Sequence, residues 1–317
     1  MTDTQNEVFK SPVNKIRLFE HGAPGSQNLK LTRKYYTEDM PDGRVKHIVQ
    51  NITDPDIVPY IPDGIGNSTD RQRIPAVLII PGGAFRRLVY NFEGEDVAKW
   101  LNSMGIAAFV LECRLPSDEH DNAEDVPLID AMRAMRVIRG MAQEFGIDEA
   151  KIGVMGFSAG GFMAALLSTA YESDVYADYK YKDEYDKLSA RPDFAVCSYP
   201  VISIDDCIEA GKRYMSEEQV LERISDSKAK ILHKYNPDKL VRPDMPPVFI
   251  CETDDDRTTL SENSVGFYMA ARKAGVSAEL HIFRTGGHGY GCGDDFAQTG
   301  EWKVLFTKWI KSIGIIS

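Results

Sequence analysis

The sequence has few cysteines, and their placement gives no sign of a disulfide framework. There are five among 317 residues, an odd number, and no two have the close spacing of zinc ligands. We therefore expect all five to be reduced, and no metal site built on them. No run of about 18 apolar residues occurs either, so the sequence predicts no membrane-spanning helix.

Positive charge is also scarce. Lys and Arg number 37 against 48 Asp and Glu, and the formal net charge is −11. A surface of this sign repels nucleic-acid phosphates and anionic lipid headgroups, so we expect neither nucleic acid nor a membrane as a partner.

The first residues lack the basic and apolar regions of a signal peptide, and we expect a cytoplasmic protein.

The sequence does contain short apolar runs that alternate with helical patterns. Strand-like runs cover 45–52, 76–80, 106–113, 151–156, 194–198, 247–251 and 278–283. Most are continuously apolar, which is typical of parallel strands buried on both faces. Apolar residues at helical spacing cover 95–104, the stretch from Pro127 onward and 302–313. This alternation predicts an α/β fold, with a mostly parallel central sheet and helices on both faces.

Composition suggests how the chain is organised around that sheet. Residues 1–43 are polar and broken by Pro and Gly, so we expect an extended segment packed on a single domain, 44–317. A loop is expected from 54 to 70. Two segments interrupt the alternation, the tyrosine-rich 171–191 and the charged 205–244. Each is either a solvated insertion or a small cap at the rim of the site. A homo-oligomer is possible.

One short motif carries the strongest functional signal. Gly156-Phe157-Ser158-Ala159-Gly160 has the G-x-S-x-G form of a nucleophile elbow, with an apolar strand before it and a helix of small and apolar residues after it. The motif needs this context, because the serine sits at the strained corner between strand and helix. Ser158 is therefore the candidate nucleophile.

A serine hydroxyl needs a base and a group that orients the base. Of six histidines, only His288 lies in a glycine-rich loop after a late strand. The aspartate run 254–256 follows the strand 247–251, and one of the three is expected to orient His288. The order Ser, Asp, His is typical of α/β-hydrolases. Metal binding by the run is less favoured, because no second carboxylate or histidine cluster supports it.

The reaction also needs hydrogen-bond donors for the oxyanion that forms on the attacked carbonyl. The backbone N–H of Ala159, directly after the nucleophile, is one candidate. The others come from Gly82-Gly83-Ala84, after the strand 76–80, with the N–H groups of Gly83 and Ala84 as the expected donors. The alternative interpretation of this stretch is a simple Pro-Gly turn.

These features resemble the α/β-hydrolase superfamily, and more closely its acetyl-esterase or acetyl-xylan-esterase-like carboxylesterases. The similarity rests on the segments 18–25, 80–85, 93–98, 106–111, 156–161, 191–194, 262–264 and 287–289. It implies Ser158 as nucleophile, His288 as base and Asp255 as acid, with Asp256 as the alternative. The chain departs from the family pattern at Ala84, where a third glycine is usual, and at Phe162, where a histidine is common. It departs again at 257–260, which replace an apolar and proline-containing run.

The resemblance implies a serine carboxylesterase that removes short acyl groups, acetyl above all, from sugars or xylo-oligosaccharides without metal or cofactor. Two alternatives stay open at this point. One is a serine peptidase related to the prolyl oligopeptidases, although those usually carry a further gating domain. The other is a non-catalytic binding protein on a hydrolase scaffold.

Overall fold

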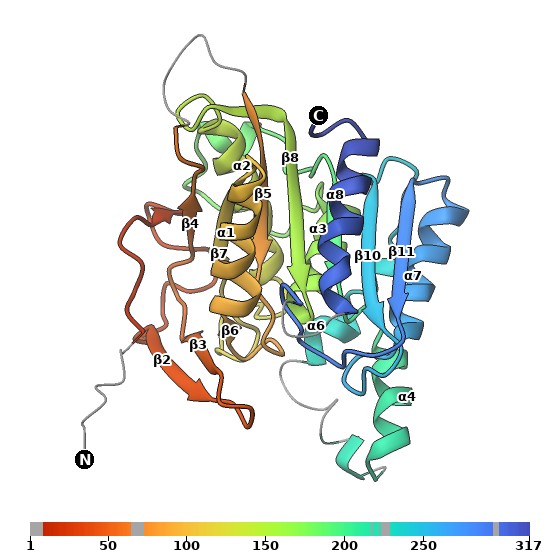
Figure 1. The fold of residues 1–317 in the computed structure, drawn as a ribbon. Coiled ribbons are helices and arrows are strands. Elements are labelled where there is room, and N and C mark those ends of the chain that lie inside the picture. Colours follow the sequence, from red (N-terminus) through yellow and green to blue (C-terminus); the bar gives the residue numbers. More distant parts are fainter. Residues whose placement is uncertain (1–8, 65–72, 217, 221, 223–228, 294–297) are drawn as a thin grey trace, which may run out of the picture.

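An eight-stranded sheet runs through the centre of the molecule (Figure 1). The computed structural model describes residues 9–64, 73–216, 218–220, 222, 229–293 and 298–317. In order across the sheet, the strands are β1 (Ile16–Arg17), β4 (Asp56–Tyr60), β7 (Ala107–Glu112), β5 (Ile74–Ile80), β8 (Ile147–Phe157), β9 (Ala195–Ser198), β10 (Val248–Thr253) and β11 (Ala278–Phe283).

The sheet is mostly parallel, as the sequence predicts. Strands β7, β5, β8, β9, β10 and β11 are parallel, and β4 alone runs in the opposite direction, paired antiparallel with β7 on one side and with the short edge strand β1 on the other. Every residue of β7, β9 and β10 is buried. Burial on both faces explains why these strands appear in the sequence as continuous apolar runs rather than as alternating patterns.

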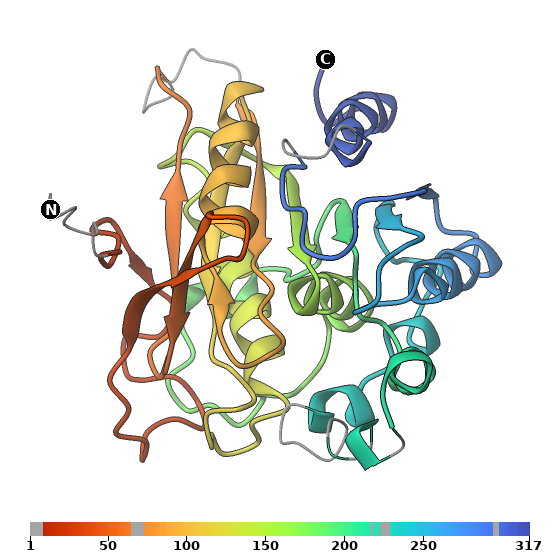
Figure 2. The ribbon, with the colours of Figure 1, turned by 60° about the horizontal axis from the view of Figure 1, so that its bottom comes forward.

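Helices cover both faces of this sheet. On one face, in the foreground of Figure 1, α1 (Asp96–Ser103) packs against α8 (Trp302–Ser312) through Trp100 and Trp302, whose ring centroids are 4.9 Å apart. The other face carries α2 (Val126–Gly140), α3 (Ala159–Ala170) and α7 (Ser261–Lys273), and Figure 2 shows the sheet between the two layers. Among the described residues, no helix is both long and apolar enough to cross a membrane.

A smaller antiparallel sheet lies beside the first and contains part of the N-terminal segment. Its strands are β2 (Lys34–Asp39), β3 (Val45–Gln50) and β6 (Leu88–Val89). The segment 1–43, expected to be only extended, therefore supplies β1 and β2. The loop expected from 54 to 70 contains the strand β4, so that expectation was wrong at 56–60, and its end, 65–70, lies outside the described residues. Pro59 lies opposite Phe109 of β7, and on the other side of β4 the short β1 pairs only with Asp56 and Ile57. Proline is tolerated in a strand that lacks a partner on one side.

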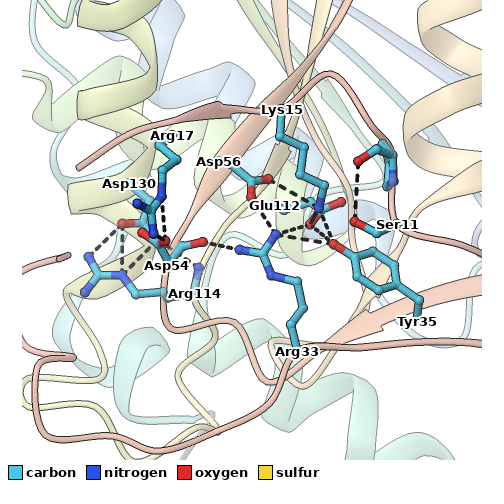
Figure 3. Close-up of polar contacts among 11 residues, drawn as sticks. Ser11, Lys15, Arg17, Arg33, Tyr35, Asp54, Asp56, Glu112, Arg114 and Asp130 are labelled. Atoms are coloured by element: carbon cyan, nitrogen blue, oxygen red, sulfur yellow. Dashed lines mark hydrogen bonds and ion pairs between the residues drawn. The ribbon is translucent and has the colours of Figure 1, made fainter. Parts of the chain in front are cut away.

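A cluster of buried charges attaches the N-terminal segment to the sheet (Figure 3). Glu112, at the end of β7, accepts hydrogen bonds from Lys15 Nζ (2.6 Å), Arg33 Nη1 (2.6 Å) and Tyr35 Oη (2.7 Å). Arg33 Nη1 also donates to Asp56 Oδ2 (2.6 Å). Burial, and then the charge of Glu112, raise the pKa of Asp56 to about 6. Asp56 and Glu112 thus share the two cations Lys15 and Arg33. The N-terminal segment stays attached only while each buried carboxylate keeps a cationic partner.

The two insertions lie at opposite edges of the sheet. Tyr171, directly after α3, donates a hydrogen bond to Asp244 (2.7 Å), which lies just before β10 begins. The tyrosine-rich segment 171–191 therefore starts at the amino edge of the sheet, away from Ser158, and it is not the rim of the site. From the segment 205–244, α4 (Ile204–Tyr214) and α6 (Ala229–Lys234) lie near the carboxyl ends of the strands, at the bottom of Figure 1.

Candidate catalytic site

Ser158 lies at a sharp turn between β8 and α3. Its φ of 55° and ψ of −118° form a backbone conformation that L-residues rarely adopt and that costs about 1–3 kcal/mol. The flanking glycines allow this turn. A Cβ on Gly156 would lie 1.9 Å from the carbonyl oxygen of Gly160, and a Cβ on Gly160 would lie 1.9 Å from that of Ile80. Both contacts are with backbone, so the G-x-S-x-G spacing has a steric cause here.

Three loops, which follow β8, β10 and β11, bring together a serine, an aspartate and a histidine. Ser158 Oγ lies 2.8 Å from His288 Nε2, and His288 Nδ1 lies 2.6 Å from Asp256 Oδ2. The carboxyl ends of parallel strands meet at one edge of a sheet, which is why residues so far apart in the sequence converge. In this arrangement Nε2 can take the serine proton while the carboxylate holds Nδ1–H.

Asp255 does not contact the histidine ring, and the expectation that it would was wrong. Its Oδ1 accepts a hydrogen bond from the backbone N–H of Gly287 (2.8 Å), and its side chain is exposed. Asp256, the alternative, is 2% exposed and faces His288. Adjacent residues of a turn point in different directions, so the two carboxylates reach different partners. Asp255 ties the histidine loop to the loop after β10.

Asp256 is held by two threonines. Its Oδ1 accepts the N–H groups of Thr258 (2.6 Å) and Thr259 (2.9 Å), and its Oδ2 accepts Thr259 Oγ1–H (2.9 Å). Burial acts to raise the pKa of Asp256. The hydrogen bond and charge of His288, with the two backbone N–H groups, outweigh burial and leave this pKa below its ordinary value. Sequence reasoning missed the role of Thr259, and the available signal was the departure from the family pattern at 257–260.

The expected oxyanion donors lie around the serine. Ala159 begins α3, and the loop after β5 bends back with φ of 138° at Gly83 and 57° at Ala84. Within the described part of the chain, the N–H groups of these three residues have no protein acceptor. The loop passes close to the nucleophile, because a Cβ on Gly82 would lie 2.9 Å from the Cβ of Ser158.

A narrow, mostly apolar pocket opens beside Ser158. Its lining includes Pro81, Phe85, Leu88, Leu115, Pro127 and Met163. The free volume is about 10 Å³, room for about one water-sized group. Arg114 forms part of the wall and is fixed by a fully buried ion pair with Asp130 (2.6 Å, Figure 3).

Two further buried side chains lie behind the site, and no sequence motif indicated directly that they would lie there. Tyr199 packs the edge of its ring against His288, with ring centroids 5.0 Å apart. Glu93 accepts hydrogen bonds from Tyr199 Oη (2.9 Å) and from the N–H of Gly82 (2.8 Å). The only signal for Glu93 was its position in the family-like segment 93–98. Across the described ranges, no group of three or more His, Cys, Asp or Glu side chains is arranged as a metal site.

Comparison with known sequences identifies the family of the chain. A sequence profile of the BD-FAE family matches residues 65–270. The acetylxylan esterase of Xylanibacter ruminicola is 31% identical over 240 residues, which are 75% of this chain and 45% of that protein. The chain spans less than half the length of the curated relatives that it matches.

Solved structures give the same result for the fold. The acetyl ester-xyloside bifunctional hydrolase from Caldicellulosiruptor lactoaceticus superposes with a TM-score of 0.70 at 34% identity, covering 96% of this chain and 97% of that one. A carboxylesterase from Lactobacillus plantarum superposes with a TM-score of 0.67 at 20% identity, covering 90% and 99%. The α/β-hydrolase fold predicted from the sequence is confirmed, and the chain belongs to the BD-FAE family.

Proposed function

We propose that this chain is a serine carboxylesterase that hydrolyses short acyl esters, acetyl above all, carried on a sugar or xylo-oligosaccharide. The hydrogen-bonded series Ser158–His288–Asp256 carries this proposal. Membership of the BD-FAE family and the esterase relatives support hydrolysis of carboxylic esters. Asp256 takes the role that the sequence had assigned to Asp255.

The reaction follows from the contacts of these residues. Ser158 Oγ attacks the ester carbonyl as His288 Nε2 accepts its proton, and Asp256 stabilises the imidazolium. The carbonyl oxygen becomes an oxyanion that accepts hydrogen bonds from the N–H groups of Gly83, Ala84 and Ala159. His288 then protonates the leaving alcohol as the ester bond breaks. Water, deprotonated by His288, attacks the acyl-enzyme and releases the acid and Ser158.

The size of the pocket beside Ser158 supports a small acyl group. Its enclosed part is small, about 10 Å³, and this favours a small acyl group over a long one. Its apolar lining excludes water from the acyl side, where desolvation strengthens the hydrogen bonds to the oxyanion. Acetyl is the acyl group that fits this space best.

The alcohol that we propose is a sugar. The names of the relatives point to acetylated xylan and xylosides, and the negative net charge suits an uncharged substrate. The tyrosine-rich segment 171–191 does not contribute a sugar site at the rim, because it starts at the opposite edge of the sheet. A sugar would instead meet the loops at the carboxyl edge and the neighbouring α4 and α6.

Labelling with a fluorophosphonate probe tests the proposal, because only an activated serine reacts with it. We expect the parent protein to be labelled at Ser158 and to release acetate from acetylated xylo-oligosaccharides. Ser158→Ala should fold normally, resist labelling and lose several powers of ten in turnover. An unlabelled parent would indicate a non-catalytic scaffold. Labelling with faster cleavage of peptides than of esters would indicate a peptidase.

A further inference from the structure

Glu93 is a buried acidic side chain directly behind the loop that carries the candidate oxyanion donors. It lies on the helical turn Asn91–Glu95 before α1 and is 5% exposed. Its Oε2 accepts the N–H of Gly82 at 2.8 Å. A Cβ on Gly82 would lie 2.7 Å from this oxygen and 2.9 Å from the Cβ of Ser158. Gly82 is thus clamped between the carboxylate and the nucleophile.

Tyr199 connects the same carboxylate to the histidine loop. Its Oη donates to Glu93 Oε1 (2.9 Å) and accepts the N–H of Gly291 (3.0 Å). Its ring contacts those of His288 (5.0 Å) and Tyr290 (4.5 Å). Its φ of 37° is uncommon for a bulky residue. Glu93 and Tyr199 therefore join the loops that follow β5, β9 and β11.

The direction of these hydrogen bonds indicates the ionisation state of Glu93. A backbone N–H can only donate, so Tyr199 Oη accepts from Gly291 and directs its own proton to Glu93. Gly82 N–H donates to the other carboxylate oxygen. Burial raises the pKa of Glu93 above its ordinary value, and the charge of His288 and the two donors offset only part of this rise. With both oxygens accepting, the ionised form fits the contacts and places a negative charge near His288.

We infer that Glu93 is a positioning residue of the catalytic site, which sets where the Gly83 and Ala84 N–H groups lie relative to Ser158 and His288. The inference rests on the proposed esterase function. Glu93 does not touch the substrate. It acts by holding Gly82, the residue before the two donors, and by steadying the imidazolium through its charge. Because oxyanion and imidazolium exist together only in the transition state, Glu93 acts on turnover more than on substrate binding.

The test uses Glu93→Gln and Tyr199→Phe in the full chain. Glutamine keeps the size of the side chain but turns an amide N–H₂ toward one of the two donors. Phenylalanine keeps the ring packed on His288 but removes the hydroxyl that binds Glu93 and Gly291. Rates on an acetyl ester are divided by the concentration of active sites, titrated with the fluorophosphonate probe, which corrects for unfolded protein. We expect kcat per site to fall about 30-fold in Glu93→Gln, less than the roughly 100-fold or more for losing an oxyanion donor itself. KM should stay within about threefold.

The effects of the two substitutions on kcat should not add, because both break the same hydrogen-bond network between Gly82, Glu93, Tyr199 and Gly291. Glu93→Gln with Tyr199→Phe should be about as slow as Glu93→Gln alone. A trifluoromethyl ketone, which forms an oxyanion with the serine, should bind Glu93→Gln more weakly, by about the factor lost in kcat/KM.

Glu112→Gln is the matched control, since Glu112 is also buried but belongs to the N-terminal charge cluster. It should lower Tm and leave kcat per site unchanged. The inference is overturned if Glu93→Gln and Tyr199→Phe keep kcat per site within about threefold of the parent, or if only KM changes. Should Glu93→Gln fail to fold, Tyr199→Phe decides. A parent that does not react with the probe overturns the proposed function instead.

Discussion

At the scale of single residues, the site depends on which of two adjacent carboxylates faces the histidine. Asp256 lies 2.6 Å from His288 Nδ1, and Asp255 binds the N–H of Gly287. The first contact fixes the ring in the tautomer that leaves Nε2 free for the serine proton. The second positions only backbone.

The same substitution at both positions separates these roles. Asp256→Asn should lower kcat by roughly 10²–10⁴, because an amide neither selects the right tautomer nor stabilises the imidazolium. Asp255→Asn keeps an oxygen that can accept the hydrogen bond from the N–H of Gly287, so its kcat should stay within about tenfold of the parent value. Steady-state hydrolysis of an acetyl ester measures both. A larger loss at Asp255 than at Asp256 would contradict the geometry.

Glu252 provides a test of stability against pH. It is fully buried near the end of β10, and burial, then the charge of Asp256, raise its pKa well above the ordinary value. A carboxyl group whose pKa is raised on folding makes its full contribution to stability at pH values below its pKa in the unfolded state, which is about 4.3. This contribution is lost as pH rises through the folded-state pKa.

The Tm of Glu252→Gln minus the Tm of the parent should therefore increase as pH rises from about 4 to about 8, because the glutamine side chain cannot ionise. Gln keeps an acceptor for the N–H of Thr253, which binds Glu252 Oε1 at 2.9 Å. Thermal unfolding of both proteins across this range measures the effect. The exposed Glu301→Gln serves as control and should show a constant difference. A constant difference for Glu252→Gln as well would refute the prediction.

At the scale of elements, the N-terminal segment is attached by charge as well as by packing. Arg33 pairs with both Asp56 and Glu112, and its removal would leave two buried carboxylates with Lys15 alone. A buried charge that loses its partner is costly, whereas an exposed ion pair contributes little.

Arg33→Met should lower the free energy of unfolding by about 3 kcal/mol. Arg17→Met removes the exposed pair with Asp54 and should cost less than about 1 kcal/mol. Urea unfolding of the two variants and the parent gives both values. Similar losses in the two variants would show that the buried cluster does not hold the segment.

At the scale of the whole molecule, the pocket beside Ser158 exists only because separate elements meet there. Its walls come from the loops after β5 and β7 and from α2 and α3. Met163, on α3, is 2% exposed and fills one side.

Met163→Ala should enlarge this pocket and shift preference toward longer acyl groups. We expect the ratio of kcat/KM for butyrate over acetate p-nitrophenyl esters to rise about tenfold. Met135→Ala, a fully buried methionine of α2 outside the pocket lining, is the matched control. Both variants should lose about 2 kcal/mol or more of stability, but only the first should change the ratio. An unchanged ratio in Met163→Ala would argue against this pocket as the acyl site.

Much of the architecture could be predicted because it depends on local sequence. Strand-like runs, most of them continuously apolar, predicted the parallel strands β5, β7, β8, β9, β10 and β11, and helical spacing predicted α1, α2 and α8. The strand β4 was missed because Asp56 and Pro59 resemble loop residues. In the folded chain Asp56 pairs with Arg33, and Pro59 lies beyond the reach of the short edge strand β1, so a strand can contain both.

The sequence by itself determined the serine elbow and the histidine loop, because glycines at fixed spacing allow backbone turns that other residues would block. The tertiary structure decided that Asp256 rather than Asp255 faces His288, since side-chain direction within a turn depends on distant partners such as the N–H of Gly287. It also decided that Glu93 lies behind Gly82, because a single buried carboxylate shows its role only when the loops it joins are seen together.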